Sequence, residues 1–122
     1  MEYAIHIEGL NKHFPHAEFK ALDQLSLNFE KSIIAGILGP NGAGKTTTIS
    51  VLCGLLKKDS GTAKVLGLDV ESNISEIQKR IGVVPQQTAL FPQLTGFENL
   101  EYIGRLYKIS KTELSKRIND LC

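Results

Sequence analysis

The sequence has few of the residues that build disulfide-rich or zinc-binding domains. It contains two cysteines, Cys53 and Cys122, among 122 residues, and no tryptophan. Two thiols do not form a disulfide framework, so we expect both to be reduced, with Cys53 as a small apolar core residue. The three histidines, at positions 6, 13 and 16, are not spaced with cysteines or aspartates as metal ligands are. The pattern therefore argues against a zinc site.

The chain also lacks long apolar runs and an excess of charge of one sign. Fourteen basic residues face thirteen acidic ones, for a net charge of +1, which gives no large field to steer the protein toward nucleic acid or anionic lipid. No apolar run approaches the ~20 residues that span a bilayer, and no basic start with an apolar core opens the chain. We expect a cytoplasmic protein that binds no nucleic acid and reaches a membrane only through a partner.

Four segments have strand-like patterns of two kinds. Residues 3–9 and 21–29 alternate apolar and polar side chains, which predicts antiparallel strands with one solvated face. Residues 32–39 and 81–85 are instead continuous apolar runs. Such runs are typical of strands that a parallel sheet buries on both faces.

Helices are predicted between and after these strands. Apolar residues recur at helical spacing over 44–56, where Gly54 stands near the expected C-cap and Thr48 and Ser50 are expected on the helix surface. A turn at Asp59–Gly61 predicts a short strand after it.

Further helices are predicted in the C-terminal half of the chain. A short helix is expected over 72–81, with Ser72 or Asn73 at its N-cap. The spacing of Leu100, Ile103 and Leu106 predicts a helix over 97–107. Beyond it, Ser110 and Glu113 form a capping-box pattern that opens another helix.

The stretch from Gly39 to Thr46, "GPNGAGKT", satisfies every fixed position of the phosphate-loop pattern G-x-x-x-x-G-K-[ST] and lies between a predicted strand and a predicted helix. Gly39, Gly42 and Gly44 lack Cβ atoms, so the loop can adopt positive φ and turn its amides toward a phosphate chain. The following helix directs its free N–H groups and positive dipole end to the same anion.

Three side chains complete this predicted site. The Lys45 ammonium suits the β- and γ-phosphates, and the Thr46 hydroxyl is a hard oxygen ligand for Mg²⁺. Thr47 is placed to reach the α-phosphate with its amide and hydroxyl. The alternative, a glycine-rich turn with an exposed lysine, explains neither the strand nor the helix that flank the loop.

Three stretches narrow the class of phosphate-loop protein. "LGPNGAGKTT" is the usual sequence of one family's Walker A loop. "LNKHF" (10–14) is similar to the N-terminal segment of that family, and "IGVVPQQTALFPQLTGFENL" (81–100) is similar to its Q-loop region. On these motifs the chain resembles the nucleotide-binding domains of ATP-binding cassette (ABC) transporters along nearly its whole length. "ENLEYIGRLY" is most similar to cassettes of multidrug or ABC-2-type exporters.

The resemblance implies a role for each site residue. Phe14 would stack on the adenine ring, where the family most often has tyrosine, although a core aromatic is the alternative. Gln86 would ligate Mg²⁺ together with Thr46 and sense the γ-phosphate, although a solvated loop glutamine is the alternative. ATP and Mg²⁺ are the implied cofactors. The implied phosphate-loop contacts are Gly39, Pro40, Asn41, Gly42, Ala43, Gly44, Lys45, Thr46 and Thr47.

The resemblance also implies a fold and its limits. We expect an α/β fold, the N-terminal portion of a P-loop ABC ATPase. It would comprise an antiparallel β region (1–31), a partial P-loop core (32–86) and the start of a helical subdomain (87–122). The sequence has no Walker B strand ending in Asp-Glu, no "LSGGQ" signature and no switch histidine after it. We therefore expect an N-terminal part of a longer ATPase that alone is not catalytically competent. We expect it to be poorly soluble, to self-associate or to have partly disordered C-terminal helices.

The expected function is that of the ATP-binding subunit of an ABC transporter at the inner (plasma) membrane. The region after Gln86 would contact a transmembrane permease subunit, and two ATPase domains would form a homo- or heterodimer. Two alternatives stay open: a soluble ABC-family ATPase that acts on ribosomes or DNA, and a non-catalytic nucleotide-binding module.

Overall fold

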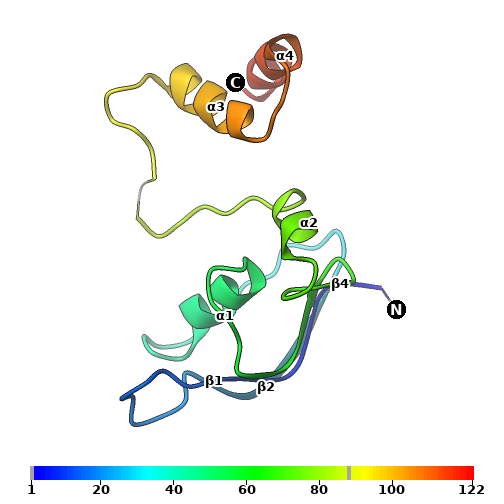
Figure 1. Ribbon diagram of the computed structural model, residues 1–122, viewed down its shortest axis with the longest axis vertical. Helices are drawn as coiled ribbons and strands as arrows, with labels where there is room; N and C mark the ends of the chain where they lie inside the picture. Colours follow the sequence, from blue (N-terminus) through cyan, green and yellow to red (C-terminus); the bar gives the residue numbers. More distant parts are fainter. Residues whose placement is uncertain (1, 88) are drawn as a thin grey trace. The chain divides into compact units, whose positions relative to one another are not determined.

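The computed structural model describes residues 2–87 and 89–122. The chain forms two compact units, Met1–Val83 and Val84–Cys122 (Figure 1). Each unit has its own secondary structure and is described by itself. The first combines a sheet with helices, and the second consists of helices and the segment that leads to them.

The first unit is built on an antiparallel sheet of four strands. These are β1 (Tyr3–Lys12), β2 (Leu22–Glu30), β3 (Ser60–Val65) and β4 (Leu68–Asp69), in the order β2-β1-β3-β4. The central strand β1 pairs with β2 on one side and β3 on the other. The two antiparallel strands expected from alternation, and the short strand expected after the Asp59 turn, are confirmed.

Alternation in β2 explains which face of the sheet is covered. Leu25, Leu27 and Phe29 are half-buried, whereas Ser26 and Asn28 are exposed. Successive side chains of a strand point to opposite faces, so one face of the sheet packs on the core and the other meets water. The polar face is the one that the sequence pattern predicts.

Two helices cover the apolar face of the sheet (Figure 1). They are α1 (Lys45–Leu52) and α2 (Ile74–Gln78). Asn73 takes the N-cap position of α2, one of the two predicted there. The core holds residues from the strands, both helices and the β4–α2 connection: Ile7, Leu10, Leu22, Val51, Leu52, Ala63, Val65, Val70 and Ile77.

Helix α1 is shorter than predicted because a glycine ends it. Gly54 has φ 78°, its N–H donates to Val51 O, and the N–H of Leu55 donates to Ser50 O at 2.9 Å. These two bonds are the Schellman termination that glycine favours. The buried face of the helix includes Thr48, which was expected on its surface, and Val51, while Ile49 is 42% exposed.

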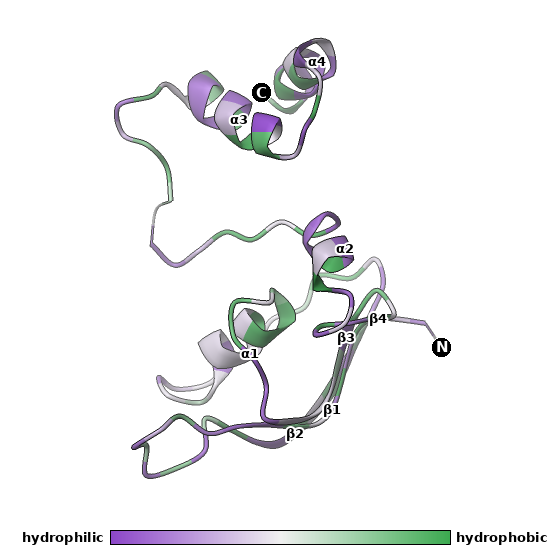
Figure 2. Ribbon diagram, viewed as in Figure 1, coloured by the Kyte–Doolittle hydropathy of each residue, from purple (hydrophilic) through white to green (hydrophobic). Residues whose placement is uncertain are grey.

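The predicted buried strands at 32–39 and 81–85 are wrong for this structure. Neither segment belongs to the sheet, and Ile34 and Leu38 are almost fully exposed, as is Val84. Figure 2 shows the hydrophobic colour of the chain just after α2, where no ladder forms. A strand that is apolar on both faces needs a neighbour at its edges and cover on its faces. None of the described residues supplies these here.

The second unit is a pair of helices, α3 (Gly96–Leu106) and α4 (Lys111–Leu121). Each begins at a residue whose side chain caps it, and of the two caps the sequence predicted the one at Ser110. Thr95 and Glu98 form a complete capping box on α3, and the Ser110 hydroxyl accepts a bond from the Glu113 N–H. The helices meet at Gly104, where an added Cβ would lie 2.2 Å from a methyl carbon of Leu114.

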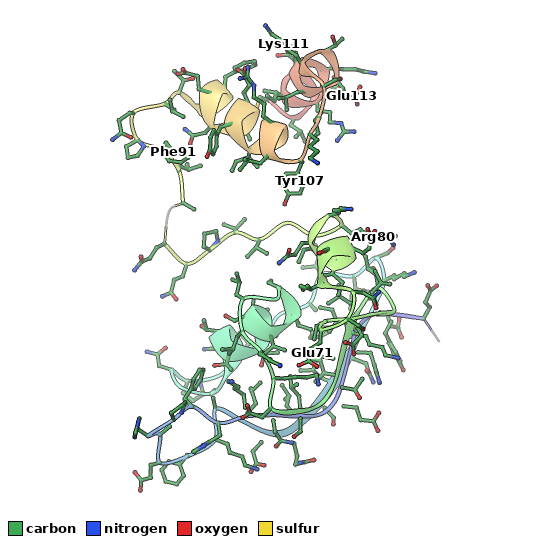
Figure 3. The ribbon with its side chains drawn as sticks, viewed as in Figure 1. Glu71, Arg80, Phe91, Tyr107, Lys111 and Glu113 are labelled. Atoms are coloured by element: carbon green, nitrogen blue, oxygen red, sulfur yellow. The ribbon has the colours of Figure 1, made fainter. Side chains whose placement is uncertain are left out.

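The apolar stripe of α3 is exposed, although its helical spacing predicted the helix correctly. Leu100, Ile103 and Leu106 are 41, 47 and 63% exposed. Aromatic side chains lie beside the stripe. Phe91, which precedes α3, packs edge-on against Tyr102 of the helix, and Tyr107 stands at the C-terminal end of the helix (Figure 3). The spacing therefore predicts the helix, while the burial of its face depends on what packs against it.

Candidate phosphate-binding site

The predicted phosphate loop leads directly into helix α1. Gly44 occupies the N-cap position with φ 93° and ψ 9°, and the helix begins at Lys45. The first amides of a helix have no acceptor within it, and they form the positive end of its dipole. The first turn of α1 carries no acidic side chain, so its positive end stays available to an anion.

Two glycines give the loop its shape. Gly42 and Gly44 have φ of 86° and 93°, a region that L-residues rarely adopt. Gly44 also has no room for a side chain, because a Cβ there would lie 2.7 Å from both Ala21 O and Leu22 Cδ2. The close approach packs the loop against the start of β2, a contact that the sequence pattern did not reveal.

The Lys45 side chain links the end of the loop to its beginning. Its ammonium donates a hydrogen bond to the carbonyl of Gly39, the first residue of the motif. The N–H of Ala43 donates to the Pro40 carbonyl at 3.2 Å, which makes a turn of the intervening residues. The cation therefore lies across the mouth of the loop, where it can transfer its hydrogen bonds to a phosphate oxygen.

Beside the loop lies a small open pocket of about 230 Å³. It is lined by the loop, the first turn of α1 and one residue that precedes β2: Ala21, Asn41, Gly42, Gly44, Lys45, Thr46 and Thr47. Pockets that hold whole drug-sized ligands measure about 300–1,000 Å³. This pocket therefore suits a phosphate chain, and a base or sugar attached to it would extend outside.

The lining has the chemistry of an anion site. The pocket offers the ammonium of Lys45, the Asn41 amide, and the hydroxyls of Thr46 and Thr47. None of the described residues that line it carries a carboxylate. Hydroxyl oxygen is a ligand that Mg²⁺ accepts together with phosphate oxygens and water. The donor set thus fits a phosphate chain with its magnesium ion.

Thr48 has a structural role that the sequence analysis missed. It is 3% exposed, and its hydroxyl donates to the carbonyl of Gly44 at 2.7 Å. The N–H of Thr48 donates to the same carbonyl at 2.9 Å. The expectation that Thr48 lies on the helix surface is wrong, because it ties the start of α1 to the last loop glycine. Ser50 is half-buried.

Phe14 lies just beyond β1, on the connection whose other end lines the pocket. Lys12 pairs with Leu22 across the β1–β2 ladder, and Ala21, next to Leu22, lines the pocket. Phe14 is 37% exposed, and the Lys12 ammonium lies 5.5 Å from the centroid of its ring. The ring is thus a half-exposed aromatic surface, and its contact with adenine stays a prediction.

Gln86 is exposed and belongs to the second unit. The structure brings together the residues from Gly39 to Thr47 within the first unit, and the contribution of Gln86 to a metal or γ-phosphate site stays a prediction. Across residues 2–87 and 89–122, no group of three or more His, Cys, Asp or Glu side chains could hold a metal ion. Within the same residues, no helix is long and apolar enough to cross a membrane.

Comparison with known proteins places the chain in a family. The model of the ABC transporter family matches residues 22–121, which is most of the chain. The protein therefore belongs to the ABC transporter family and contains part of its ATP-binding domain, the nucleotide-binding domain. The α/β fold and the family expected from the sequence motifs are both confirmed.

Relatives include ATP-binding proteins of bacteria and an ATP-binding cassette protein of the mouse. The chain is 43% identical to the ABC transporter ATP-binding protein NatA of Bacillus subtilis over 84% of its length, which is 42% of NatA. It is 37% identical to the doxorubicin resistance ATP-binding protein DrrA of Mycobacterium tuberculosis, over 98% of the chain and 36% of DrrA. With the mouse ATP-binding cassette sub-family A member 7 it shares 44% identity over 87% of the chain, which is 5% of that protein.

Solved structures share the fold. The chain is similar to cbiO1 of Clostridium perfringens, part of the transporter complex cbiONQ, with a TM-score of 0.83 and 25% identity, over 98% of this chain and 49% of that one. It is also similar to the cassette MJ0796 in a dimeric structure bound to ADP and Pi, with a TM-score of 0.79 and 26% identity. That match covers 95% of this chain and 54% of MJ0796, so the chain spans about half of each of these structures.

Proposed function

We propose that the loop from Gly39 to Thr47 binds the phosphates of MgATP, and that the full-length protein hydrolyses this ATP to drive transport by a membrane partner. The observation that carries the proposal is the pocket at the N-terminus of α1. There, free amides, one lysine and two threonine hydroxyls converge with no acidic side chain among the lining residues. This combination is complementary to a polyphosphate anion and to its magnesium ion.

Each residue has a proposed task in binding. The amides from Gly42 to Thr46 surround the phosphate chain, and Lys45 shifts its hydrogen bond from the Gly39 carbonyl to the β- and γ-phosphates. Thr46 holds Mg²⁺ through its hydroxyl, and Thr47 contacts the α-phosphate. A bound magnesium ion would neutralise charge on the phosphate oxygens. Gln86 would supply a second oxygen ligand, and Phe14 a surface for the base.

Three relatives support the wider proposal. NatA and DrrA are ATP-binding proteins by name, and the MJ0796 cassette forms a dimer that holds ADP and Pi. By analogy, this protein would pair two ATPase domains and dock a transmembrane permease subunit through the region after Gln86. It would lie on the cytoplasmic face of the inner (plasma) membrane and bind no nucleic acid.

Titration with MgATP tests the phosphate site directly. Lys45→Ala should weaken binding by about tenfold to a hundredfold, since hydrogen bonds to charged groups contribute about 1.5–3 kcal/mol. Lys64→Ala is a matched control, because Lys64 is an exposed lysine on β3 of the same unit. Equal affinities of the Lys45→Ala and Lys64→Ala variants would overturn the assignment of the loop.

Hydrolysis needs a separate measurement on the full-length protein. Phosphate release from MgATP should be detectable and should be lost in the Lys45→Ala variant, because binding and charge stabilisation both depend on the ammonium. Binding without any phosphate release, in the full-length protein with its membrane partner present, would restrict the function to that of a nucleotide-binding module.

A further inference from the structure

A lysine and an aspartate outside the phosphate loop organise the surface around Phe14. Lys12 is the last residue of β1, and its ammonium lies 5.5 Å from the centroid of the Phe14 ring. This distance is within the range of a cation–π interaction. Because Lys12 lies over one face of the ring, a planar base can stack only on the opposite face.

Asp59 fixes both the lysine and the backbone that leads to Phe14. Its Oδ1 accepts a hydrogen bond from Lys12 Nζ at 3.4 Å, and its Oδ2 accepts one from the backbone N–H of His13 at 2.6 Å. The N–H of Asp59 itself donates to the Asn11 carbonyl at 3.0 Å. Three bonds from one residue therefore hold three consecutive positions that precede Phe14.

The surroundings favour a fixed arrangement over a mobile surface pair. The Lys12 side chain is only 14% exposed, against 45% for Asp59. On the other side of Phe14, its carbonyl accepts a bond from the Ala17 N–H at 3.1 Å, and the carbonyl of Ala17 bonds the His13 ring nitrogen at 2.9 Å. The aromatic ring thus stands between two hydrogen-bonded anchors, which limits where it can move.

We propose that Lys12 and Asp59 are positioning residues for nucleotide binding, which orient the Phe14 ring so that one face receives the purine base of the nucleotide. The inference rests on the proposed function of the phosphate loop and extends it to the base. Neither residue touches the phosphates in this scheme. Their effect should therefore appear on ligands that carry a base and be absent from ligands that do not.

Two magnesium complexes separate the base from the phosphates in a binding experiment on the full-length protein. One is MgATP, and the other is magnesium tripolyphosphate, which has the phosphate chain alone. Lys12→Met keeps the aliphatic stem and loses the cation, and Asp59→Asn keeps an acceptor for His13 and loses the charge. Each variant should weaken MgATP binding by about three- to tenfold, part of the effect of a base–aromatic stack, and leave tripolyphosphate binding unchanged.

The control and the coupling test use other variants of the same unit. Lys31→Met removes the lysine of another surface ion pair, with Glu2 at 2.6 Å, at the opposite end of the β1–β2 ladder. It should bind both ligands like the wild type. In a Phe14→Ala background, Lys12→Met should have no further effect on MgATP, because the ring through which it acts is gone.

The outcomes distinguish the two levels of the proposal. Equal weakening of both ligands by Lys12→Met and Asp59→Asn would show a general structural role and overturn the positioning role, as would wild-type affinity for MgATP. Tripolyphosphate binding that is intact and lost on Lys45→Ala would still support the phosphate site. If the wild-type protein bound neither ligand, the proposed function and this inference would both fail.

Discussion

The contrast between two loop glycines gives a quantitative test of how the phosphate loop is held. Gly42 and Gly44 have similar positive φ, 86° and 93°, but different surroundings. Nothing lies within 4 Å of a Cβ built on Gly42, whereas a Cβ on Gly44 would lie 2.7 Å from Ala21 O and Leu22 Cδ2. Alanine at either site therefore adds the same backbone strain, and only alanine at position 44 adds a collision.

The expected magnitudes follow from these two terms. A left-handed backbone costs a non-glycine residue about 1–2 kcal/mol, and overpacking adds about 1–3 kcal/mol. Gly42→Ala should thus oppose the loop conformation by about 1–2 kcal/mol and Gly44→Ala by about 2–5 kcal/mol. The entropy that alanine removes from the unfolded chain is nearly the same for both and cancels in the comparison.

Two assays are needed because the cost can appear in either of two places. If the loop relaxes in the folded protein, MgATP affinity falls, by about fivefold to thirtyfold for Gly42→Ala and further for Gly44→Ala. If the loop cannot relax, the free energy of unfolding falls instead. Calorimetric titration and urea denaturation together measure the sum. A Gly44→Ala variant whose summed loss does not exceed that of Gly42→Ala would refute the role of the contact with the start of β2.

Three further predictions concern the fold. Ile77→Ala should lower the free energy of unfolding by about 2–5 kcal/mol in urea denaturation, because Ile77 is fully buried in the core of the first unit; a loss under half a kilocalorie would contradict that packing. The pKa of Asp69 is lowered from its ordinary value of 3.8, chiefly by the hydrogen bond from the Ser72 N–H. The stability that the ionised Asp69 contributes is therefore complete above pH 3.8 and is lost as the pH falls through the lower pKa of the folded state. Asp69→Ala should remove this component from the free energy of unfolding measured over a series of pH values. An unchanged pH dependence in the variant would contradict the prediction. Asn99→Ala should speed hydrogen exchange and proteolysis in the segment 91–95, because the buried Asn99 side chain bonds the backbone there through both its oxygen and its nitrogen. Asn119→Ala is the control, since Asn119 is exposed. Equal protection of the segment in the two variants would contradict the prediction.

Local patterns in the sequence predicted the elements whose structure depends on local chemistry. The alternation in β1 and β2 predicts both strands, and the predicted cap at Ser110 stands where its hydroxyl begins α4. The phosphate loop belongs to the same group, because its glycines and the following helix define a backbone shape over a few residues. The presence of these elements can therefore be predicted from a few neighbouring residues.

The apolar segments could not be predicted in the same way. Residues 32–39 and 81–85 have the composition of buried strands, but a strand becomes buried only through neighbours on its edges and faces. The stripe on α3 shows the same limit, since helical spacing reveals the stripe and leaves open what covers it. In each case the missing information is the position of other residues, which a local pattern does not contain.

The anchoring of the phosphate loop leads to a different view of how its shape is maintained. The sequence predicts a buried strand over 32–39 directly before the loop, yet that segment is exposed and outside the sheet. The loop is held instead where Gly44 packs on Ala21 and Leu22, and where Thr48 bonds the Gly44 carbonyl. Leu22 is in turn paired with Lys12 in the β1–β2 ladder. The same strand pair therefore supports the phosphate pocket through Leu22 and the Phe14 ring through Lys12, so both proposed parts of the nucleotide site depend on one antiparallel ladder.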